Sequence, residues 1–300
     1  MKLFVNDLTV MDFSYLCPQR GMVGESWIVD VLLDGALNDE SMVQDFGIVK
    51  KQLKRLIDDY VDHKLVVPAD HPNATIKKPA SDGRIQVNFE FADNKGIQLF
   101  CPPEAYAFVY ALNNDSVKDD VTQAEISKEL VNAYLKDVIA THLPENVQDI
   151  EITLREEQIS GPFYHYTHGL KKHDGNCQRI AHGHRSKIII KQNNEEDMLL
   201  QEYWANRWAD IYIGTQEDLV EATQLSFNIA FNGDMYFFKY EASQGEFEMA
   251  IEKSICEIIH QDTTVECLAQ HVLHETQKIA TGTIEVRAFE GVGKGALVSS

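Results

Sequence analysis

The sequence has no long apolar run, no paired-cysteine motif and comparatively few basic residues. No stretch reaches the roughly 18 apolar residues that a membrane helix needs. The five cysteines form no CxxC pair, which argues against a disulfide framework and for a reducing compartment. Acidic residues outnumber lysine and arginine by 47 to 27, and the net charge of −20 makes nucleic acid a poor partner. We therefore expect a cytoplasmic protein that binds neither nucleic acid nor membranes.

The composition is that of a folded protein, and the sequence carries a weak internal repeat. The 300 residues are 44% hydrophobic and 25% charged. Thr122–Glu125 and Thr263–Glu266 both precede apolar residues at helical spacing, a pattern typical of a capping box at a helix start. Each expected helix is followed by a strand that ends in glutamate, Ile150–Glu156 and Ile284–Glu290. The order helix, strand, glutamate thus occurs twice.

The N-terminal segments of the two halves also match. Met22–Glu25 leads into an expected strand at Trp27–Leu33, and Ala181–His184 leads into another at Lys187–Lys191. Ser41–Tyr60 has the apolar spacing of a helix, and the second half has no clean counterpart for it.

Two hairpins complete the expected fold. One pairs Ile85–Phe91 with Gly96–Phe100, and the other runs from Leu225–Phe231 through the Asn232-Gly233 turn into Met235–Tyr240. We therefore predict an α+β protein of two units, residues 1–160 and 161–300, each a four-stranded antiparallel sheet with helices on one face.

The most closely spaced candidate metal-ligating and catalytic residues lie in the second unit. His182 and His184 are two residues apart, which places both imidazoles on one face of a strand, and His168 can return from a preceding strand. Three nitrogen ligands with an open fourth position are typical of a catalytic zinc, and Cys177 lies between them in the sequence. The alternative is that these histidines are only the polar end of a strand.

Two further sequence features have both a functional and a purely structural interpretation. Asp62 and His63 directly follow the expected long helix, where a histidine is favoured by the helix dipole. A basic cluster within seventeen residues contains a single acid, Asp174, and predicts either an anion site or a solvated loop. Its members are Lys171, Lys172, Arg179, Arg185 and Lys187.

The order histidine, cysteine-containing loop, His-Gly-His resembles the zinc site of the 6-pyruvoyl tetrahydropterin synthase family, which includes the 6-carboxytetrahydropterin synthases and has the tunnelling fold. The resemblance implies zinc as the cofactor and 7,8-dihydroneopterin triphosphate as the substrate, with a 6-carboxy or 6-pyruvoyl product, in queuosine-type deazapurine synthesis or another pathway. It also implies the ligands His168, His182 and His184, the general base Cys177 and the catalytic pair Asp62 and His63.

The same resemblance implies the groups that bind the substrate. Glu290 lies where the family has the glutamate that grips the pterin, and the segment around Thr263 and Thr264 is similar to the family's segment before its second helix. Arg179 or Arg185 could receive the triphosphate.

Each half lacks a set of candidate site residues that the other half has. The first half has Val23 and Glu25, with Cys17 or a neighbour, where the second half has histidines, so we expect it to be metal-free. The second half runs Trp208-Ala-Asp-Ile-Tyr-Ile-Gly at the place where the first has its Asp-His pair, and it has no such pair. We therefore expect a composite active site between the halves, within one chain or between neighbouring chains, in a homo-oligomer.

Three other functions stay open. A nitrile reductase that acts on a deazapurine also occurs as a tandem of this fold, but it would not need three histidines around a metal. A hydrolase or aldolase could act on a related pterin. The chain could also be a catalytically inactive pterin-binding protein, because half of its motifs are degenerate.

Overall fold

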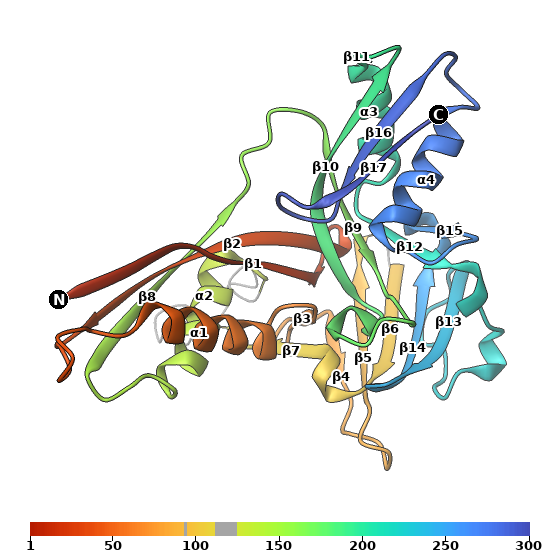
Figure 1. Cartoon of the computed structure of the whole chain (residues 1–300). Coiled ribbons are helices and arrows are strands. Elements are labelled where there is room, and N and C mark those ends of the chain that lie inside the picture. The colour runs from red at the N-terminus through yellow and green to blue at the C-terminus, as the bar shows by residue number, and fades with distance from the viewer. Residues whose placement is uncertain (93–94, 112–124) are drawn as a thin grey trace.

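The computed structural model describes residues 1–92, 95–111 and 125–300, and over these ranges the chain forms three β-sheets and four α-helices. The expected α+β class is confirmed (Figure 1). No helix in these ranges is both long enough and apolar enough to span a membrane.

The first sheet is built on a long antiparallel hairpin of β1 (Lys2–Cys17) and β2 (Gly21–Gly35). Its full order is β7-β3-β1-β2-β8, with β3 (Leu65–Pro68), β7 (Tyr106–Val109) and β8 (Val147–Glu156). Helices α1 (Phe46–Tyr60) and α2 (Lys128–Ala140) pack against this sheet through apolar stripes that include Leu53 and Leu135.

The second sheet repeats this arrangement around the hairpin of β9 (Phe163–His168) and β10 (His182–Gln192). Its order is β15-β12-β9-β10-β16-β17, with β12 (Ile211–Thr215), β15 (Cys256–Ile259), β16 (Ile284–Phe289) and β17 (Gly295–Ser299), while β11 (Glu195–Glu196) pairs with β10. Helices α3 (Met198–Arg207) and α4 (Val265–Thr276) supply buried residues to its core. Five strands of each sheet thus follow the same order.

Both sheets differ from the expected four antiparallel strands. They contain five and seven strands, and β3 and β12 run parallel to β1 and β9. The chain passes through α1 between β2 and β3 and through α3 between β10 and β12. Each strand after the helix runs antiparallel to the strand before it and pairs on the far side of the hairpin, parallel to β1 or β9. The expectation was wrong because the short parallel strands lack the alternation that marks a hairpin.

The third sheet joins hairpins from the two halves of the chain. It contains β4 (Ala74–Ile76), β5 (Ile85–Phe91), β6 (Lys95–Cys101), β13 (Met235–Ala242) and β14 (Gly245–Glu252), in the order β13-β14-β6-β5-β4. Strand β14 pairs with β6 from Glu248 opposite Phe100 to Ile251 opposite Ile97. Figure 1 shows this sheet below the second one, beside the end of the first hairpin.

Two helix starts differ from the expected capping boxes. Ser127 is the N-cap of α2, and its side chain accepts from the amide of Leu130. Thr122, the expected first residue of that box, lies outside the described ranges. Thr264 caps α4 in place of Thr263, because the Thr263 hydroxyl is buried and makes other hydrogen bonds.

The long first helix is shorter than expected and has a counterpart. It begins at Phe46, with Asp45 as its N-cap, and not at Ser41. Helix α3 occupies the matching place in the second half, with Asp197 as its N-cap. The apolar periodicity of α3 is weak, because Gln201 and Trp204 are its buried side chains and the other positions of the helix are partly or fully exposed.

The expected hairpin at the Asn232-Gly233 turn is wrong in its first arm. Residues 225–231 form no strand, and β13 pairs with β14. The side chain of Gln98 takes the place of a strand ladder there, since it accepts from the amide of Ala230 at 2.7 Å and donates to the carbonyl of Asn228 at 3.2 Å.

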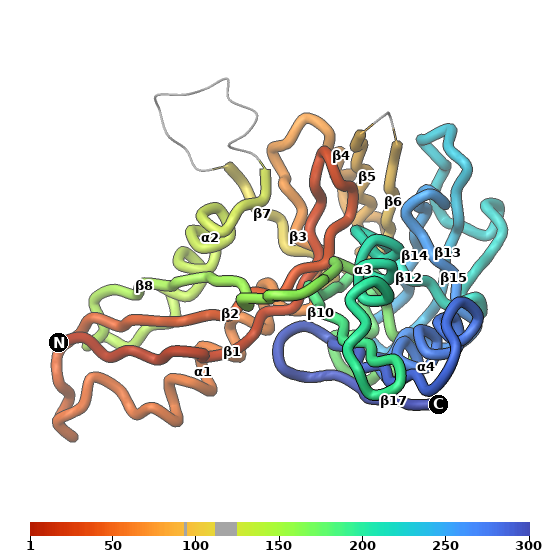
Figure 2. The backbone as a smooth tube through the Cα atoms, turned by 90° about the horizontal axis from the view of Figure 1, so that it is seen from above, coloured from red at the N-terminus to blue at the C-terminus, as the bar shows by residue number. Residues whose placement is uncertain are grey.

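The two long hairpins cross at Gly24 and Gly183. A β-carbon on Gly24 would lie 2.0 Å from the carbonyl oxygen of Tyr166 and 2.6 Å from the amide nitrogen of His184. A β-carbon on Gly183 would lie 2.6 Å from Cα of Gly24. Only glycine permits so close an approach. The crossing brings the end of β1 and the start of β2 against the start of β10 (Figure 2).

Candidate metal centre

Three histidines meet where β9 ends and β10 begins. His168 lies opposite His182 in the antiparallel ladder, and His184 follows two residues later on the same face. One ring nitrogen of each lies within 4.8 Å of those of the other two, and their side chains are 0%, 0% and 1% exposed. The group could hold a metal ion.

The hydrogen bonds around these rings leave at least one nitrogen of each ring unpaired among the described residues. Nδ1 of His168 lies 3.0 Å from the Thr263 hydroxyl, and Nδ1 of His182 lies 3.0 Å from the carbonyl oxygen of Arg179. Nε2 of all three histidines is buried without a hydrogen-bond partner among the described residues. Buried polar atoms rarely lack a hydrogen-bond partner. Convergent orphan nitrogens, with outer contacts that fix two of the rings, fit a metal ion.

The protonation of the rings also suits a metal. Burial, together with neighbouring imidazoles, lowers the pKa of His168 and of His182 well below the usual value. Both rings are therefore neutral at neutral pH, and neutral imidazole is the form that binds metal.

The third ring is oriented by Asp12 of β1, a residue that the sequence reasoning missed. Its Oδ1 lies 3.2 Å from Nδ1 of His184, outside ideal hydrogen-bond geometry, and accepts from the Ser26 hydroxyl at 2.5 Å. Lys294 Nζ lies 3.2 Å from its other oxygen. Burial alone would raise the pKa of Asp12, but His184 and Lys294 hold it well below its usual range. Asp12 is therefore an ionised outer partner of His184.

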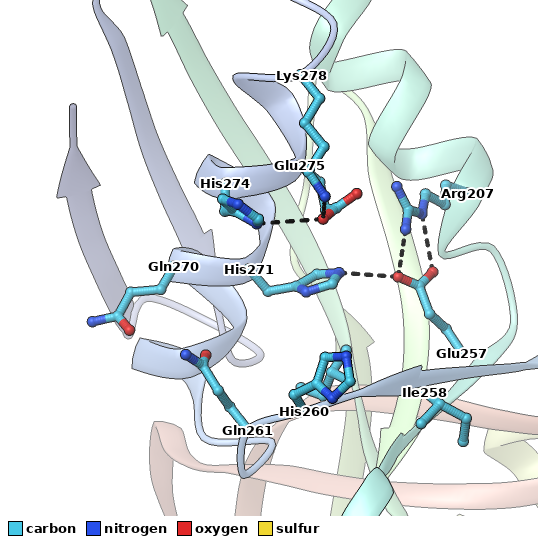
Figure 3. A pocket seen from close by; sticks show the side chains of 11 residues that line it. Arg207, Glu257, Ile258, His260, Gln261, Gln270, His271, His274, Glu275 and Lys278 are labelled. Atoms are coloured by element: carbon cyan, nitrogen blue, oxygen red, sulfur yellow. Dashed lines mark hydrogen bonds and ion pairs between the residues drawn. The ribbon is translucent and has the colours of Figure 1, made fainter.

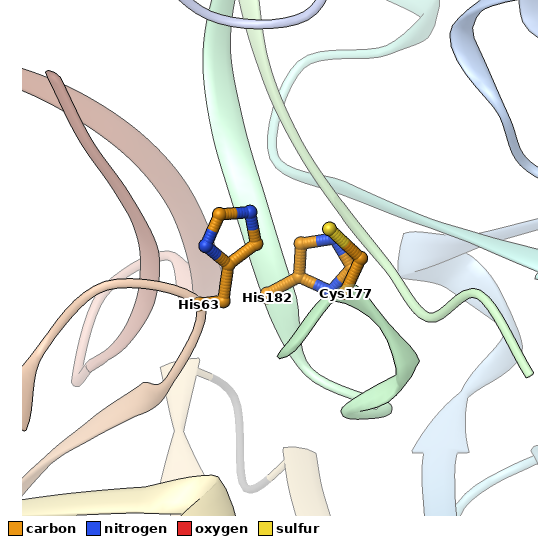
Figure 4. Close-up of side chains that lie close together, drawn as sticks. All are labelled: His63, Cys177 and His182. Atoms are coloured by element: carbon orange, nitrogen blue, oxygen red, sulfur yellow. The ribbon is translucent and has the colours of Figure 1, made fainter. Parts of the chain in front are cut away.

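Cys177 and His63 lie directly beside this centre. The thiol of Cys177, in a short 3₁₀ turn at 176–178, lies within 4.8 Å of ring nitrogens of His63 and His182. The His63 and His182 rings are 5.2 Å apart (Figure 4). Nδ1 of His63 lies 2.5 Å from Oδ2 of Asp62. The structure thus brings together one group from each half, within a single chain.

The loop after α1 holds the His63 side chain in place. His63 has a φ of 54°, a left-handed conformation that is uncommon for a non-glycine residue, and its amide donates to the carbonyl of Asp12 at 2.7 Å. Burial lowers the pKa of His63, but the hydrogen bonds to Asp62 and Cys177 outweigh it and raise this pKa to about 10. His63 is therefore an imidazolium at neutral pH.

Glu290 lies beside His184. It follows the end of β16, and its Oε1 is 3.9 Å from Nε2 of His184. Its second oxygen is 3.7 Å from Nζ of Lys294. A carboxylate therefore borders the histidine centre, beside a lysine.

The other expected substrate-binding residues do not all lie at the histidine centre. Thr263 is buried against His168, and the Thr264 hydroxyl accepts from a helix amide. Arg179 lies near the centre, with Nη1 3.4 Å from the carbonyl of His63 and Nε 3.0 Å from the side chain of Gln244. Arg185 lies 4.2 Å above the Phe163 ring and donates to the carbonyl of Glu157 at 3.0 Å.

Three members of the basic cluster are paired with acids. Lys171 lies 2.5 Å from Asp218, Lys172 lies 3.0 Å from Asp262, and Lys187 lies 2.5 Å from Glu157. Their positive charge is therefore largely compensated, which leaves Arg179 as the member of the cluster beside the centre.

A separate cavity of about 480 Å³ lies at the outer end of the second sheet (Figure 3). Glu257 within it accepts from Arg207 at 2.7 Å and 3.0 Å, lies 3.1 Å from Nε2 of His271, and also accepts from Trp208. Its carboxylate is fully occupied by these contacts, which tie β15 to α3 and α4.

Comparison with known proteins agrees with the expected family. A family profile described as 6-pyruvoyl tetrahydropterin synthase matches residues 17–164, a span that includes Asp62 and His63 and ends before His168. No curated protein matches the chain.

Solved structures of the same kind also match. The 6-pyruvoyl tetrahydropterin synthase of Plasmodium vivax is 18% identical, with 53% of this chain and 93% of that chain covered and a TM-score of 0.38. The Plasmodium falciparum enzyme is 16% identical, with 51% and 90% covered and a TM-score of 0.37.

Proposed function

Because the chain belongs to the 6-pyruvoyl tetrahydropterin synthase family, we propose that it is a zinc-dependent pterin synthase. Its substrate would be 7,8-dihydroneopterin triphosphate and its product a 6-carboxy- or 6-pyruvoyl-tetrahydropterin. The observation that carries the proposal is the group of three buried, unpaired histidine nitrogens beside Cys177. His168, His182 and His184 would hold the zinc.

The residues around the centre have distinct roles in the proposed reaction. Zinc held by His168, His182 and His184 would supply a Lewis acid at the substrate side chain. Cys177 acts as the base that takes a proton from the neighbouring carbon. His63 lies beside the thiol as an imidazolium and stabilises the thiolate, and Asp62 holds the proton on Nδ1 of His63. Glu290 would hold the pterin through a charge-assisted contact.

We also propose that residues 1–160 and 161–300 are two copies of one unit, of which only the second binds metal. The shared strand order of the two main sheets supports this division, as does the third sheet that both halves build. The active site would then be composite, with Asp62 and His63 from the first copy and Cys177 and the metal ligands from the second.

Elemental analysis and product analysis test the function together. Purified protein should hold about one zinc per chain, and a His182→Ala, His184→Ala variant should hold none. Mass spectrometry after incubation with dihydroneopterin triphosphate should detect the product. Cys177→Ala should abolish turnover without loss of zinc. The control is Cys267→Ser, whose thiol lies on α4 and belongs to neither group of metal-ligating side chains among the described residues, and which should keep activity.

Each readout can fail separately. Protein purified without chelators that lacks metal would contradict the zinc centre. A zinc-loaded protein that leaves the substrate unchanged would contradict the synthase activity, and near-normal turnover by Cys177→Ala would place the base elsewhere.

A further inference from the structure

The short turn that carries Cys177 needs support from another part of the molecule. Cys177 lies in the 3₁₀ turn Asn176–Gln178, whose N-cap Gly175 provides no side-chain hydrogen bond. A single turn of this kind is only marginally stable by itself. The Cys177 thiol nevertheless lies within 4.8 Å of a ring nitrogen of His63, and a catalytic group has to be held to about 0.5 Å. Contacts from outside the turn must therefore fix its position.

The side chain of Gln178 provides one set of these contacts. Gln178 directly follows Cys177 and is 0% exposed, although glutamine is usually a surface residue. Its Oε1 accepts from the amide of Gln244 at 2.6 Å, and its Nε2 donates to the Ser243 hydroxyl at 2.9 Å. The same Nε2 donates to the carbonyl of Gly175, the residue before the turn, at 3.0 Å. One buried side chain thus closes the turn and binds it to Ser243 and Gln244.

The side chain of Gln244 contacts residues on both sides of Cys177 in the sequence. Its Nε2 donates to Oδ1 of Asn176 at 2.8 Å, and its Oε1 accepts from Nε of Arg179 at 3.0 Å. Nη1 of Arg179 in turn donates to the carbonyl of His63 at 3.4 Å. Gln244 therefore binds the turn of Cys177 directly and the loop of His63 through Arg179.

The third sheet supports these contacts. Ser243 and Gln244 form the turn between β13 and β14, and β14 pairs with β6 of the first half. The hydroxyl of Tyr240, a buried residue of β13, donates to the carbonyl of Gln178 at 2.7 Å. Groups held by regular strands are placed more precisely than groups on loops. The turn of Cys177 is thus fastened to a sheet that both halves of the chain build.

We propose that Gln178 and Gln244 form an amide clamp that positions the Cys177 thiol beside the His63 imidazole. Both are positioning residues, because they act on the thiol through its turn and not through contact with a substrate. The clamp rests on the proposed function only in so far as Cys177 is the base of that reaction, since the placement of the thiol beside the imidazole is the same for any substrate. The third sheet then serves the active site as well as joining the two halves.

Two variants of the full chain remove the clamp. Gln178→Met keeps the length of the side chain without its hydrogen bonds, and Gln244→Ala truncates a side chain that is only partly buried, so the fold should tolerate it. Gln98→Met is the matched control. Gln98 is also fully buried and lies in the third sheet, but its side chain bonds to Asn228 and Ala230. Thermal unfolding and zinc content are measured for each protein beside the wild type.

Two rates test the position of the thiol. We expect Gln178→Met and Gln244→Ala to lower kcat for dihydroneopterin triphosphate by about tenfold or more, with KM and zinc content unchanged. Alkylation of Cys177 by iodoacetamide at pH 7, followed by mass spectrometry, should slow by about tenfold too, because the His63 imidazolium no longer lies beside the thiolate. Gln98→Met should lose thermal stability but keep both rates.

The alkylation rate decides on the clamp independently of turnover. Alkylation of Cys177 in both clamp variants as fast as in Gln98→Met would overturn the proposal. Faster alkylation would overturn it as well, because it would mean that the two glutamines only shield the thiol. Slower alkylation in both variants supports the clamp even if the wild-type protein leaves dihydroneopterin triphosphate unchanged, a result that would contradict the proposed function alone.

Discussion

At the scale of single residues, Asp12 is the group that links the two halves at the metal centre. Its carboxylate orients His184, its amide donates to Asp62 at 2.8 Å, and its carbonyl accepts from the amide of His63. Nothing in the local sequence marks it, because its partners lie far away along the chain. A strand residue becomes a site residue here only through the crossing of the hairpins.

Asp12→Asn should therefore weaken metal binding. The variant keeps the shape of the side chain but removes the charge that polarises His184, and loss of an outer partner typically costs 10- to 100-fold in metal affinity. Competition with a chromophoric chelator measures the change. Asp30→Asn is the control, since Asp30 lies on the same hairpin in a salt bridge with Arg155. Equal zinc affinity in the two variants would exclude Asp12 as a positioning residue.

Glu25 predicts a pH dependence of stability. Burial raises its pKa to about 7, from 4.5. A carboxyl whose pKa is raised in the folded state stabilises that state below the unfolded pKa, and the contribution is lost as the pH rises through 7. The free energy of unfolding should fall between pH 5 and pH 8 by up to about 3 kcal/mol from this group.

Urea unfolding at both pH values measures this effect. Glu25→Gln should remove that part of the pH dependence, whereas Glu241→Gln, which changes an exposed carboxylate, should keep it. A pH profile of Glu25→Gln that parallels the wild type would contradict the assignment.

At the scale of elements, periodicity predicted the helices α1, α2 and α4 and the hairpin of β5 and β6. The β5 and β6 strands were expected within one residue of their observed ends, since their apolar residues alternate and a turn lies between them. The three histidines could be predicted as a group because their spacing fits a strand pair. Helix α3 and the parallel strands could not, because their burial depends on partners distant in the sequence.

The crossing of the two hairpins predicts a strict requirement for glycine. Gly183→Ala would place its β-carbon 2.4 Å from the carbonyl oxygen of Tyr166, so β10 must shift together with its histidines. We expect loss of zinc and destabilisation by roughly 2 kcal/mol or more. Gly161→Ala is the control, because a β-carbon there meets nothing within 4 Å. Thermal unfolding and metal content report both effects, and a stable, zinc-loaded Gly183→Ala protein would contradict the crossing.

At the scale of the whole molecule, the two halves are joined by more than a linker. Strand β14 pairs with β6 in the third sheet, and the hairpins of the first and second sheets cross at their glycines. These contacts fix the loop of His63 relative to the turn of Cys177. The sequence left open whether the two residues meet within one chain or between chains, because local patterns carry no information on long-range pairing.

The meeting of His63 and Cys177 in one chain predicts a failure of complementation. His63→Ala and Cys177→Ala should each be inactive, and mixing the two under subunit exchange should not restore turnover, because each chain lacks one half of its own site. Differently tagged wild-type chains, mixed and separated in the same way, would verify that any oligomer exchanges its subunits. Restored activity would mean that the residues come from different chains. Full activity of His63→Ala alone would instead reduce the Asp62 and His63 pair to a helix-end contact.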